Sequence, residues 1–104
     1  MAPRFEVIFD DVMLNQLKKL GRNQEVKSRI SKMLDKVEEL GPRAGKMLDV
    51  RLGIYEVKSK RPPIRLYFKH VKNTGQIYVF GYEMKTSAGR QQATIERLKE
   101  KSEP

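Results

Sequence analysis

The sequence contains no cysteine, and its 104 residues include a single histidine, His70. Without cysteine the chain cannot form a disulfide scaffold, a thiolate zinc site or a cysteine nucleophile. One histidine and scattered carboxylates provide no set of metal ligands, and we predict neither a metal nor a cofactor. The sequence also lacks a phosphate-binding glycine loop and a Ser/His/Asp arrangement. Any chemistry must therefore come from lysine, arginine, tyrosine or carboxylate groups.

Long apolar segments are missing as well. No run approaches the roughly 20 apolar residues that a membrane helix needs, and the N-terminus lacks the apolar core of a signal peptide. A chain of 104 residues can bury one core without the help of a metal or a disulfide. We therefore predict one domain, residues 1–104, located in the cytoplasm.

Positive charge is abundant but unevenly distributed. Of the net charge of +9, residues 1–40 contribute +1 and residues 41–104 contribute +8. A localised positive field favours nucleic acid, an acidic protein or an anionic membrane surface as a partner. The alternative is a solvated basic surface that only aids solubility.

The first half of the sequence predicts a strand followed by two helices. Arg4–Phe9 alternates between polar and apolar residues, and the Asp10-Asp11 pair can cap a helix that runs to about Leu20. Asn23 can cap a second helix, which ends at Gly41-Pro42. The apolar residues of this second helix recur at helical spacing, and they are Val26, Ile30, Met33, Leu34, Val37 and Leu40.

The second half predicts an antiparallel meander and a last helix. Its connections are Gly53, Arg61-Pro62-Pro63 and Asn73-Thr74-Gly75. The helix is expected from Ser87 or Ala88 to about Lys101, with Ser87 as a possible N-cap. The strands are expected at Met47–Leu52, Ile54–Ser59, Ile64–Val71 and Gln76–Met84. The predicted fold class is α+β: an antiparallel sheet, made of the N-terminal strand and the meander, packs against the N-terminal helical hairpin.

The segment Ile64–Lys69 alternates strictly. In a strand, Ile64, Leu66 and Phe68 point to one face, and Arg65, Tyr67 and Lys69 point to the other. The first set can close a core, and the second set offers positive charge beside an aromatic ring, which suits polyphosphate. Because Arg65 lies off this core face, we expect its replacement by alanine to leave the fold unchanged.

Three motifs occur within these strands: Leu52-Gly53-Ile54-Tyr55-Glu56-Val57-Lys58, Ile64-Arg65-Leu66-Tyr67-Phe68 and Val79-Phe80-Gly81-Tyr82-Glu83-Met84-Lys85-Thr86. Together with the predicted order of elements, they resemble the RelE/ParE toxin superfamily, in particular its phage-related, HigB-like branch. The resemblance covers about Leu14 to Lys101. Two positions depart from the family pattern: Met84 stands where the family has a first lysine, and Ala88-Gly89 stands where it has Thr-Pro.

The resemblance implies a RelE-like fold and a toxin of a bacterial type II toxin–antitoxin system. Such a toxin is a metal-independent endoribonuclease that cleaves mRNA on the ribosome, inhibits translation and is neutralised by an antitoxin, usually of the helix-turn-helix type. In this chemistry a 2′-hydroxyl attacks the neighbouring phosphorus, so the site must move protons and stabilise charge on the phosphoryl group.

The catalytic candidates that the resemblance implies are Arg65, Lys58, Lys85, Tyr82 and Glu56. Arg65 would bind phosphate oxygens with its planar fork. The two lysines would stabilise charge or transfer protons, Tyr82 would stack on a base or hold a phosphate, and Glu56 would act as a base. The structural alternatives are an Arg65–Glu56 ion pair, solvated lysines and a tyrosine that completes the packing. The RNA-binding candidates are Arg51, Lys60, Arg61, Tyr67, Lys69, Lys72 and Arg90.

His70 is the only side chain that normally titrates near neutral pH. Its parity places it on the face of Ile64, Leu66 and Phe68, which argues against a catalytic role. It is therefore left out of the site.

Two other functions are compatible with the sequence, because fold alone does not fix function. A gyrase inhibitor of the ParE type would stay toxic when Arg65 and Lys85 are replaced. A non-catalytic, basic nucleic-acid-binding module would show salt-sensitive binding without cleavage.

Overall fold

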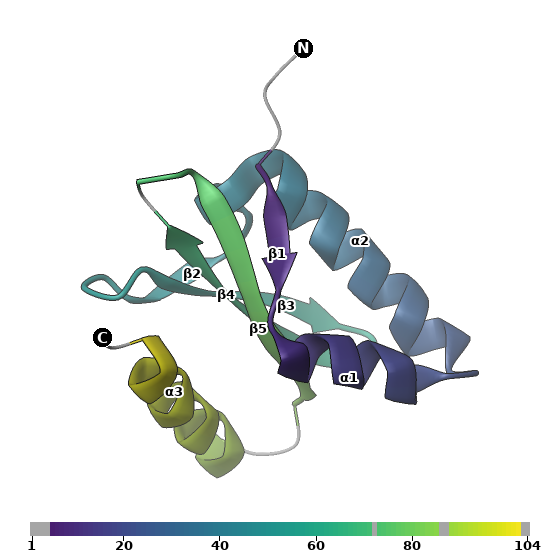
Figure 1. The fold of residues 1–104 in the computed structure, drawn as a ribbon. Coiled ribbons are helices and arrows are strands. Elements are labelled where there is room, and N and C mark those ends of the chain that lie inside the picture. The colour runs from purple at the N-terminus through teal and green to yellow at the C-terminus, as the bar shows by residue number, and fades with distance from the viewer. Residues whose placement is uncertain (1–4, 72, 86–87, 103–104) are drawn as a thin grey trace.

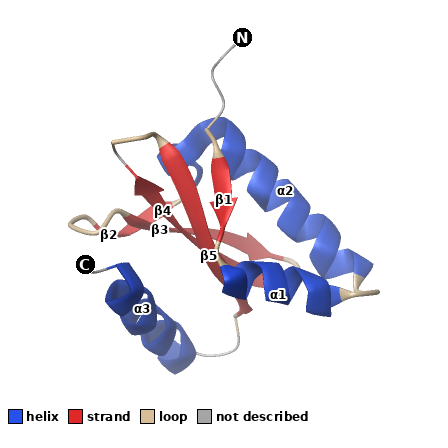
Figure 2. Cartoon of the chain, viewed as in Figure 1, coloured by secondary structure: helices blue, strands red, loops and turns tan. Residues whose placement is uncertain are grey.

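The computed structural model describes residues 5–71, 73–85 and 88–102. Figure 1 shows two helices on one face of a sheet and the C-terminal helix on the other. Figure 2 shows the same view with the helices in blue and the strands in red. The elements are β1 (Val7–Phe9), α1 (Asp11–Leu20), α2 (Gln24–Leu40), the 3-10 helix η1 (Gly41–Ala44), β2 (Lys46–Asp49), β3 (Ile54–Lys60), β4 (Pro63–Val71), β5 (Gln76–Met84) and α3 (Ala88–Ser102).

The α+β class is confirmed. Five strands of the described chain form one sheet in the order β1-β5-β4-β3-β2. The meander is antiparallel as predicted, but β1 runs parallel to β5, with Val7 opposite Ile77 and Phe9 opposite Val79. The prediction of a purely antiparallel sheet is therefore wrong at this one pair. A parallel partner is possible here because two helices and three strands intervene, which gives the chain room to cross over.

The helical hairpin forms as its capping residues predict. The Asp10 side chain accepts a hydrogen bond from the Val12 N–H, and the Asn23 side chain accepts one from the Val26 N–H. Helix α1 ends at Gly21, which has a φ of 50°, a backbone conformation that glycine adopts without steric cost. The predicted ends of both helices are confirmed.

Several strand boundaries differ from the predictions: β1 begins only at Val7, β2 is Lys46–Asp49, β3 extends to Lys60 and β4 begins at Pro63. Strand β2 ends at Asp49, because the Asp49 carboxylate accepts a hydrogen bond of 2.8 Å from the Leu52 N–H and turns the chain. Arg51 and Leu52 therefore lie in a turn. Pro63 begins β4 opposite Lys60, a position where a proline without an N–H is tolerated.

The main core lies between the sheet and the α1–α2 hairpin. Ile64, Leu66 and Phe68 from β4 are fully buried against it, as their alternation predicts. From the helices, Met13, Ile30 and Val37 complete this layer. Each of these side chains removes apolar surface from water, which is the main stabilising contribution to such a fold.

The opposite face of the sheet is not open. Leu52, Ile54, Tyr67 and Phe80 form a second buried cluster there with Leu98 of α3. Tyr67 is only 1% exposed. The expectation that this face offers an aromatic ring beside positive charge is therefore wrong at Tyr67, because α3 covers the middle of the face.

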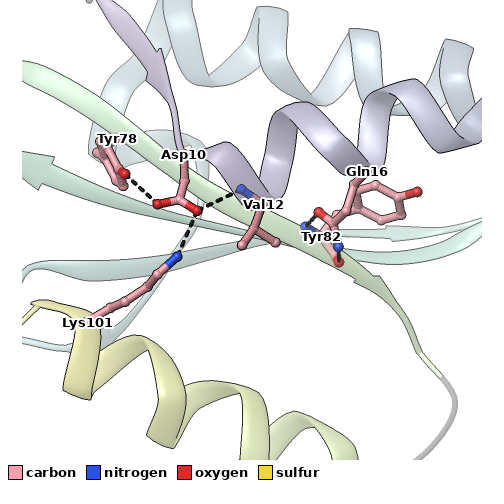
Figure 3. Close-up of polar contacts among 6 residues, drawn as sticks. All are labelled: Asp10, Val12, Gln16, Tyr78, Tyr82 and Lys101. Atoms are coloured by element: carbon pink, nitrogen blue, oxygen red, sulfur yellow. Dashed lines mark hydrogen bonds and ion pairs between the residues drawn. The ribbon is translucent and has the colours of Figure 1, made fainter.

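A β-bulge in the β4–β5 pair changes which side chains share a face. Tyr67 is opposite Gly81, but the next residue, Phe68, is opposite Val79, so Phe80 is an extra residue in β5. Gln16 of α1 binds the backbone next to this bulge: its side chain donates to the Tyr82 carbonyl at 2.8 Å and accepts from the Tyr82 N–H at 2.9 Å (Figure 3). One side chain thus satisfies both backbone groups.

We expect Gln16→Ala to destabilise the fold by about 1–3 kcal/mol, because it leaves a partly buried donor and acceptor without partners. Asn15→Ala is the matched control, since Asn15 is an exposed neighbour on the same helix. Urea unfolding of both variants measures the difference. Equal midpoints would show that water replaces Gln16 without cost.

Candidate functional site

The strand register gathers four cations at one end of the α3 face. Lys58 is opposite Arg65, Lys60 is opposite Pro63, and the Lys85 N–H donates to the Pro63 carbonyl at 2.9 Å. Residues opposite each other on neighbouring strands, and residues two apart on one strand, share a face. We call this group, Lys58, Lys60, Arg65 and Lys85, the cationic corner. It brings together three of the five catalytic candidates.

Within the corner, Arg65 is held by a buried carboxylate. Its Nε lies 3.6 Å from Glu56 Oε2, and the side chains of Arg65 and Glu56 are 18% and 3% exposed. This separation suits an ion pair but is too long for a hydrogen bond. The Arg65 Nε is buried and has no hydrogen-bond partner among the described residues. Glu56 therefore orients the guanidinium, and because the Nε is buried, only the exposed part of the Arg65 side chain can reach a ligand.

Glu83 and Thr94 were missed by the sequence reasoning. The Tyr67 hydroxyl donates to Glu83 Oε1 at 2.5 Å, and the Thr94 hydroxyl donates to Glu83 Oε2 at 2.6 Å. Burial, followed by the bond to Glu83, raises the pKa of Tyr67. Tyr67 thus remains a neutral hydrogen-bond donor beneath α3, and these contacts tie the helix to the sheet. The bulge places Glu83 opposite Arg65, and no local sequence signal reveals that.

Tyr82 does not lie at the corner. It is opposite Leu66, and its ring packs against the main core on the α1–α2 side. Burial raises the pKa of Tyr82, as expected for a ring that packs rather than one that meets solvent. Its placement therefore favours the packing alternative over base stacking.

The RNA-binding candidates are dispersed. Lys69 lies on the α3 face, opposite Tyr78, at the other end of the sheet from the corner. Arg51 lies in the turn after β2, and Lys60 and Arg61 line a groove beside α2. Tyr67 is buried. Lys72 and the side chain of Arg90 lie outside the described residues, as does the predicted cap Ser87.

His70 lies on the same face of β4 as Ile64, Leu66 and Phe68, as its position in the alternation predicts. It is opposite Ile77, and its ring makes an edge contact with Phe5, with 6.0 Å between the ring centroids. Among the residues that the structure describes, no three His, Asp or Glu side chains gather as metal ligands. No helix in that part of the chain is long and apolar enough to cross a membrane.

The C-terminal turn of α3 is anchored by Asp10 at the start of α1 (Figure 3). Besides capping α1, the Asp10 carboxylate accepts hydrogen bonds from the Tyr78 hydroxyl at 2.5 Å and from Lys101 Nζ at 2.7 Å. Burial alone would raise the pKa of Asp10, but the bonds from Lys101, Tyr78 and Val12 outweigh it and lower the pKa below its ordinary value. The hydrogen bond from the Tyr78 hydroxyl to Asp10 raises the pKa of Tyr78 to about 12.

The pKa of Asp10 is lower in the folded state than in the unfolded state. The Asp10 carboxylate therefore stabilises the fold at pH values above the ordinary carboxyl pKa. This stabilisation is lost as the pH falls through the pKa of the folded state. We expect Asp10→Asn to lower the free energy of unfolding by about 1–2 kcal/mol at neutral pH. The difference from the parent should shrink below about pH 4. Urea unfolding across pH measures it, with the exposed Asp11→Asn as control. A difference that persists unchanged at low pH would contradict the assignment.

Comparison with solved structures identifies the fold. The isolated E. coli RelE toxin superposes with a TM-score of 0.65 at 20% identity, over 90% of this chain and 98% of that one. The toxin–antitoxin complex RelBE2 from Mycobacterium tuberculosis gives a TM-score of 0.65 at 15% identity, over 84% and 98%. The intact E. coli RelBE toxin–antitoxin complex gives 0.63 at 23% identity, over 80% and 99%.

The sequence itself matches no protein-family model, and a search of curated proteins also finds no match. At these identities the likeness establishes architecture and leaves activity to be argued from the site. Element order, sheet topology and near-complete coverage of the neighbours agree: the chain has the fold of the RelE toxin.

Proposed function

We propose that this chain, as one domain, is the toxin of a bacterial type II toxin–antitoxin system, from the phage-related, HigB-like branch of the RelE/ParE superfamily. It acts in the cytoplasm as a ribosome-dependent mRNA endoribonuclease that inhibits translation. A cognate antitoxin, of the helix-turn-helix type, neutralises it. The fold supports the class, since two of the similar structures are toxin–antitoxin complexes.

The observation that carries the proposed activity is the cationic corner. RNA cleavage by 2′-hydroxyl attack develops negative charge on the phosphoryl oxygens, and preorganised cations stabilise it. In our proposal Arg65 binds these oxygens, because Glu56 fixes its position and part of its side chain, which is 18% exposed, remains accessible. Lys58 and Lys85 flank it and stabilise charge or transfer protons.

The proposed roles of two candidates change with the geometry. Glu56 is buried beside Arg65, so we assign it the positioning of the guanidinium instead of proton abstraction from RNA. Tyr82 is assigned to packing. No metal takes part in the proposed mechanism, because the cations of the corner supply the charge that a metal ion would otherwise provide.

The test uses purified protein and ribosomes programmed with a defined mRNA, with product ends mapped by primer extension. We expect cleavage at defined positions within the translated region. A 2′-deoxynucleotide at the cleaved position should abolish that product, because the attacking hydroxyl is gone, whereas the same change one codon away should not. Growth arrest by the toxin without any ribosomal cleavage, accompanied by inhibition of gyrase, would overturn the proposal.

A further inference from the structure

A carboxylate lies next to Arg65 without forming an ion pair with it. The bulge in β5 places Glu83 directly opposite Arg65, and Lys85 follows two residues later along the chain. Residues opposite each other in an antiparallel pair have Cβ atoms about 5 Å apart, so Glu83 is within reach of the guanidinium. In the described part of the chain, however, no ion pair joins Glu83 to Arg65 or to Lys85.

Both oxygens of the Glu83 carboxylate are engaged by hydroxyl groups. The Tyr67 hydroxyl donates to Oε1 at 2.5 Å, and the Thr94 hydroxyl donates to Oε2 at 2.6 Å. Tyr67 is 1% exposed, so the second buried cluster fixes its ring and aims its hydroxyl at Glu83. Burial and the bond to Glu83 raise the pKa of Tyr67, and the charge of Arg65 acts in the opposite direction. Tyr67, Glu83 and Arg65 therefore lie close together.

Arg65 would be a favourable partner for this carboxylate if the hydroxyls released it. The Arg65 Nε is buried and has no hydrogen-bond partner among the described residues, and an unpaired buried donor costs free energy. A carboxylate also forms a stronger, charge-assisted bond with a guanidinium than with a neutral hydroxyl. Glu83 would thus turn towards Arg65 and cancel the positive charge that the proposed activity requires.

We propose that Tyr67 and Thr94 are positioning residues, which hold the Glu83 carboxylate away from Arg65 and so keep the guanidinium available to an RNA phosphate. The inference rests on the proposed function, which it deepens by assigning two further residues to the same site. Neither hydroxyl touches RNA in this scheme. Through Thr94, helix α3 helps to set the charge of the cationic corner, in addition to covering the sheet with Leu98.

The first test removes both hydroxyls and then the charge that they hold. Tyr67→Phe/Thr94→Val keeps the ring and the volume of the two side chains. We expect it to cleave mRNA on programmed ribosomes about tenfold more slowly in single turnovers, because Glu83 then neutralises Arg65. Adding Glu83→Gln to this double variant should restore most of the rate, since a neutral amide leaves the guanidinium charge uncancelled.

Tyr78→Phe is the matched control. It also removes a tyrosine hydroxyl that donates to a carboxylate at 2.5 Å, but the acceptor is Asp10, at the other end of the sheet. We expect it to cleave at close to the parent rate. Thr94→Val alone frees one oxygen of Glu83 and should show the changes of the double variant to a smaller degree, so unfolding of the double variant would not end the test.

A second test does not depend on cleavage. The NMR signal of the Arg65 Nε–H group reports whether a carboxylate pairs with the guanidinium. We expect this signal to move in Tyr67→Phe/Thr94→Val and to return towards its parent position when Glu83→Gln is added. A purely structural role of the two hydroxyls would produce no such return, and it would slow the triple variant at least as much as the double variant.

Three outcomes would overturn the inference. The first is an unchanged Arg65 signal in the double variant, and the second is a triple variant that cleaves as slowly as the double variant. The third is an equal loss of rate in Tyr78→Phe, which would show that any loosening beneath α3 slows cleavage. If the parent protein cleaves no mRNA on the ribosome, the proposed function fails, while the Arg65 signal still decides whether Tyr67 and Thr94 control the guanidinium.

Discussion

Replacing Arg65 by alanine is expected to slow mRNA cleavage by about 30-fold or more, which corresponds to about 2 kcal/mol in the activation barrier. The orientation of the guanidinium is fixed by a buried partner, Glu56. Its loss removes a preorganised charge from the phosphoryl group. Single-turnover cleavage on programmed ribosomes measures the effect.

The alanine variant alone would not separate catalysis from stability. It removes one cation from beside the Glu56 carboxylate, which is 3% exposed, and loss of one partner of a buried ion pair is destabilising. With this ion pair in view, we expect Arg65→Ala to lose some stability, whereas the strand alternation alone predicts an unchanged fold.

Arg65→Lys is the discriminating variant, because it keeps a positive charge near Glu56 but loses the planar fork. We expect it to unfold close to the parent midpoint and still to cleave at least about tenfold more slowly. Lys19→Ala, an exposed cation on α1, serves as the control. A folded Arg65→Lys or Arg65→Ala protein that cleaves at the parent rate would remove Arg65 from the mechanism.

Phe68→Ala should destabilise the fold by about 3–5 kcal/mol, the range for removing a large aromatic side chain from a core. Phe68 is fully buried in the central strand β4, and its ring stacks on Tyr55 with 5.3 Å between centroids. The free energy of unfolding of a domain of this size is about 5–15 kcal/mol, so the variant should be only marginally stable.

Urea unfolding gives the magnitude, and Phe68→Leu provides a graded control because it keeps most of the volume. We expect the free energy of unfolding to fall far less in the leucine variant than in the alanine variant. A loss below about 1 kcal/mol for Phe68→Ala would mean that neighbouring side chains collapse into the space.

Most of the fold could be predicted from the sequence, because its elements carry local signals. Asn23 marks the start of α2, Gly21 and Gly41 mark the ends of both helices, and the alternation of Ile64, Leu66 and Phe68 gives the core face of β4. These signals act within a few residues, so they can be recognised without tertiary information.

The candidate site was harder to predict, because it depends on long-range geometry. Strand pairing puts Lys58 opposite Arg65 and brings the Lys85 backbone to Pro63, and neither arrangement can be read from a single segment of sequence. Tyr82 and Glu83 exchange faces because Phe80 is an extra residue in β5, and a shift of one residue reverses every later side chain. Helix α3 covers Tyr67 through a tertiary contact, which the alternation of residues within β4 cannot reveal.

The pairing of β1 with β5 joins residues that are 70 positions apart, since Val7 is opposite Ile77. During synthesis the α1–α2 hairpin has only local contacts to make, whereas the sheet cannot close at that edge until most of the polypeptide has been translated. Lys85 is added later still, so the cationic corner is incomplete in every shorter nascent chain. The proposed site can therefore form only after β5 and Lys85 have been synthesised.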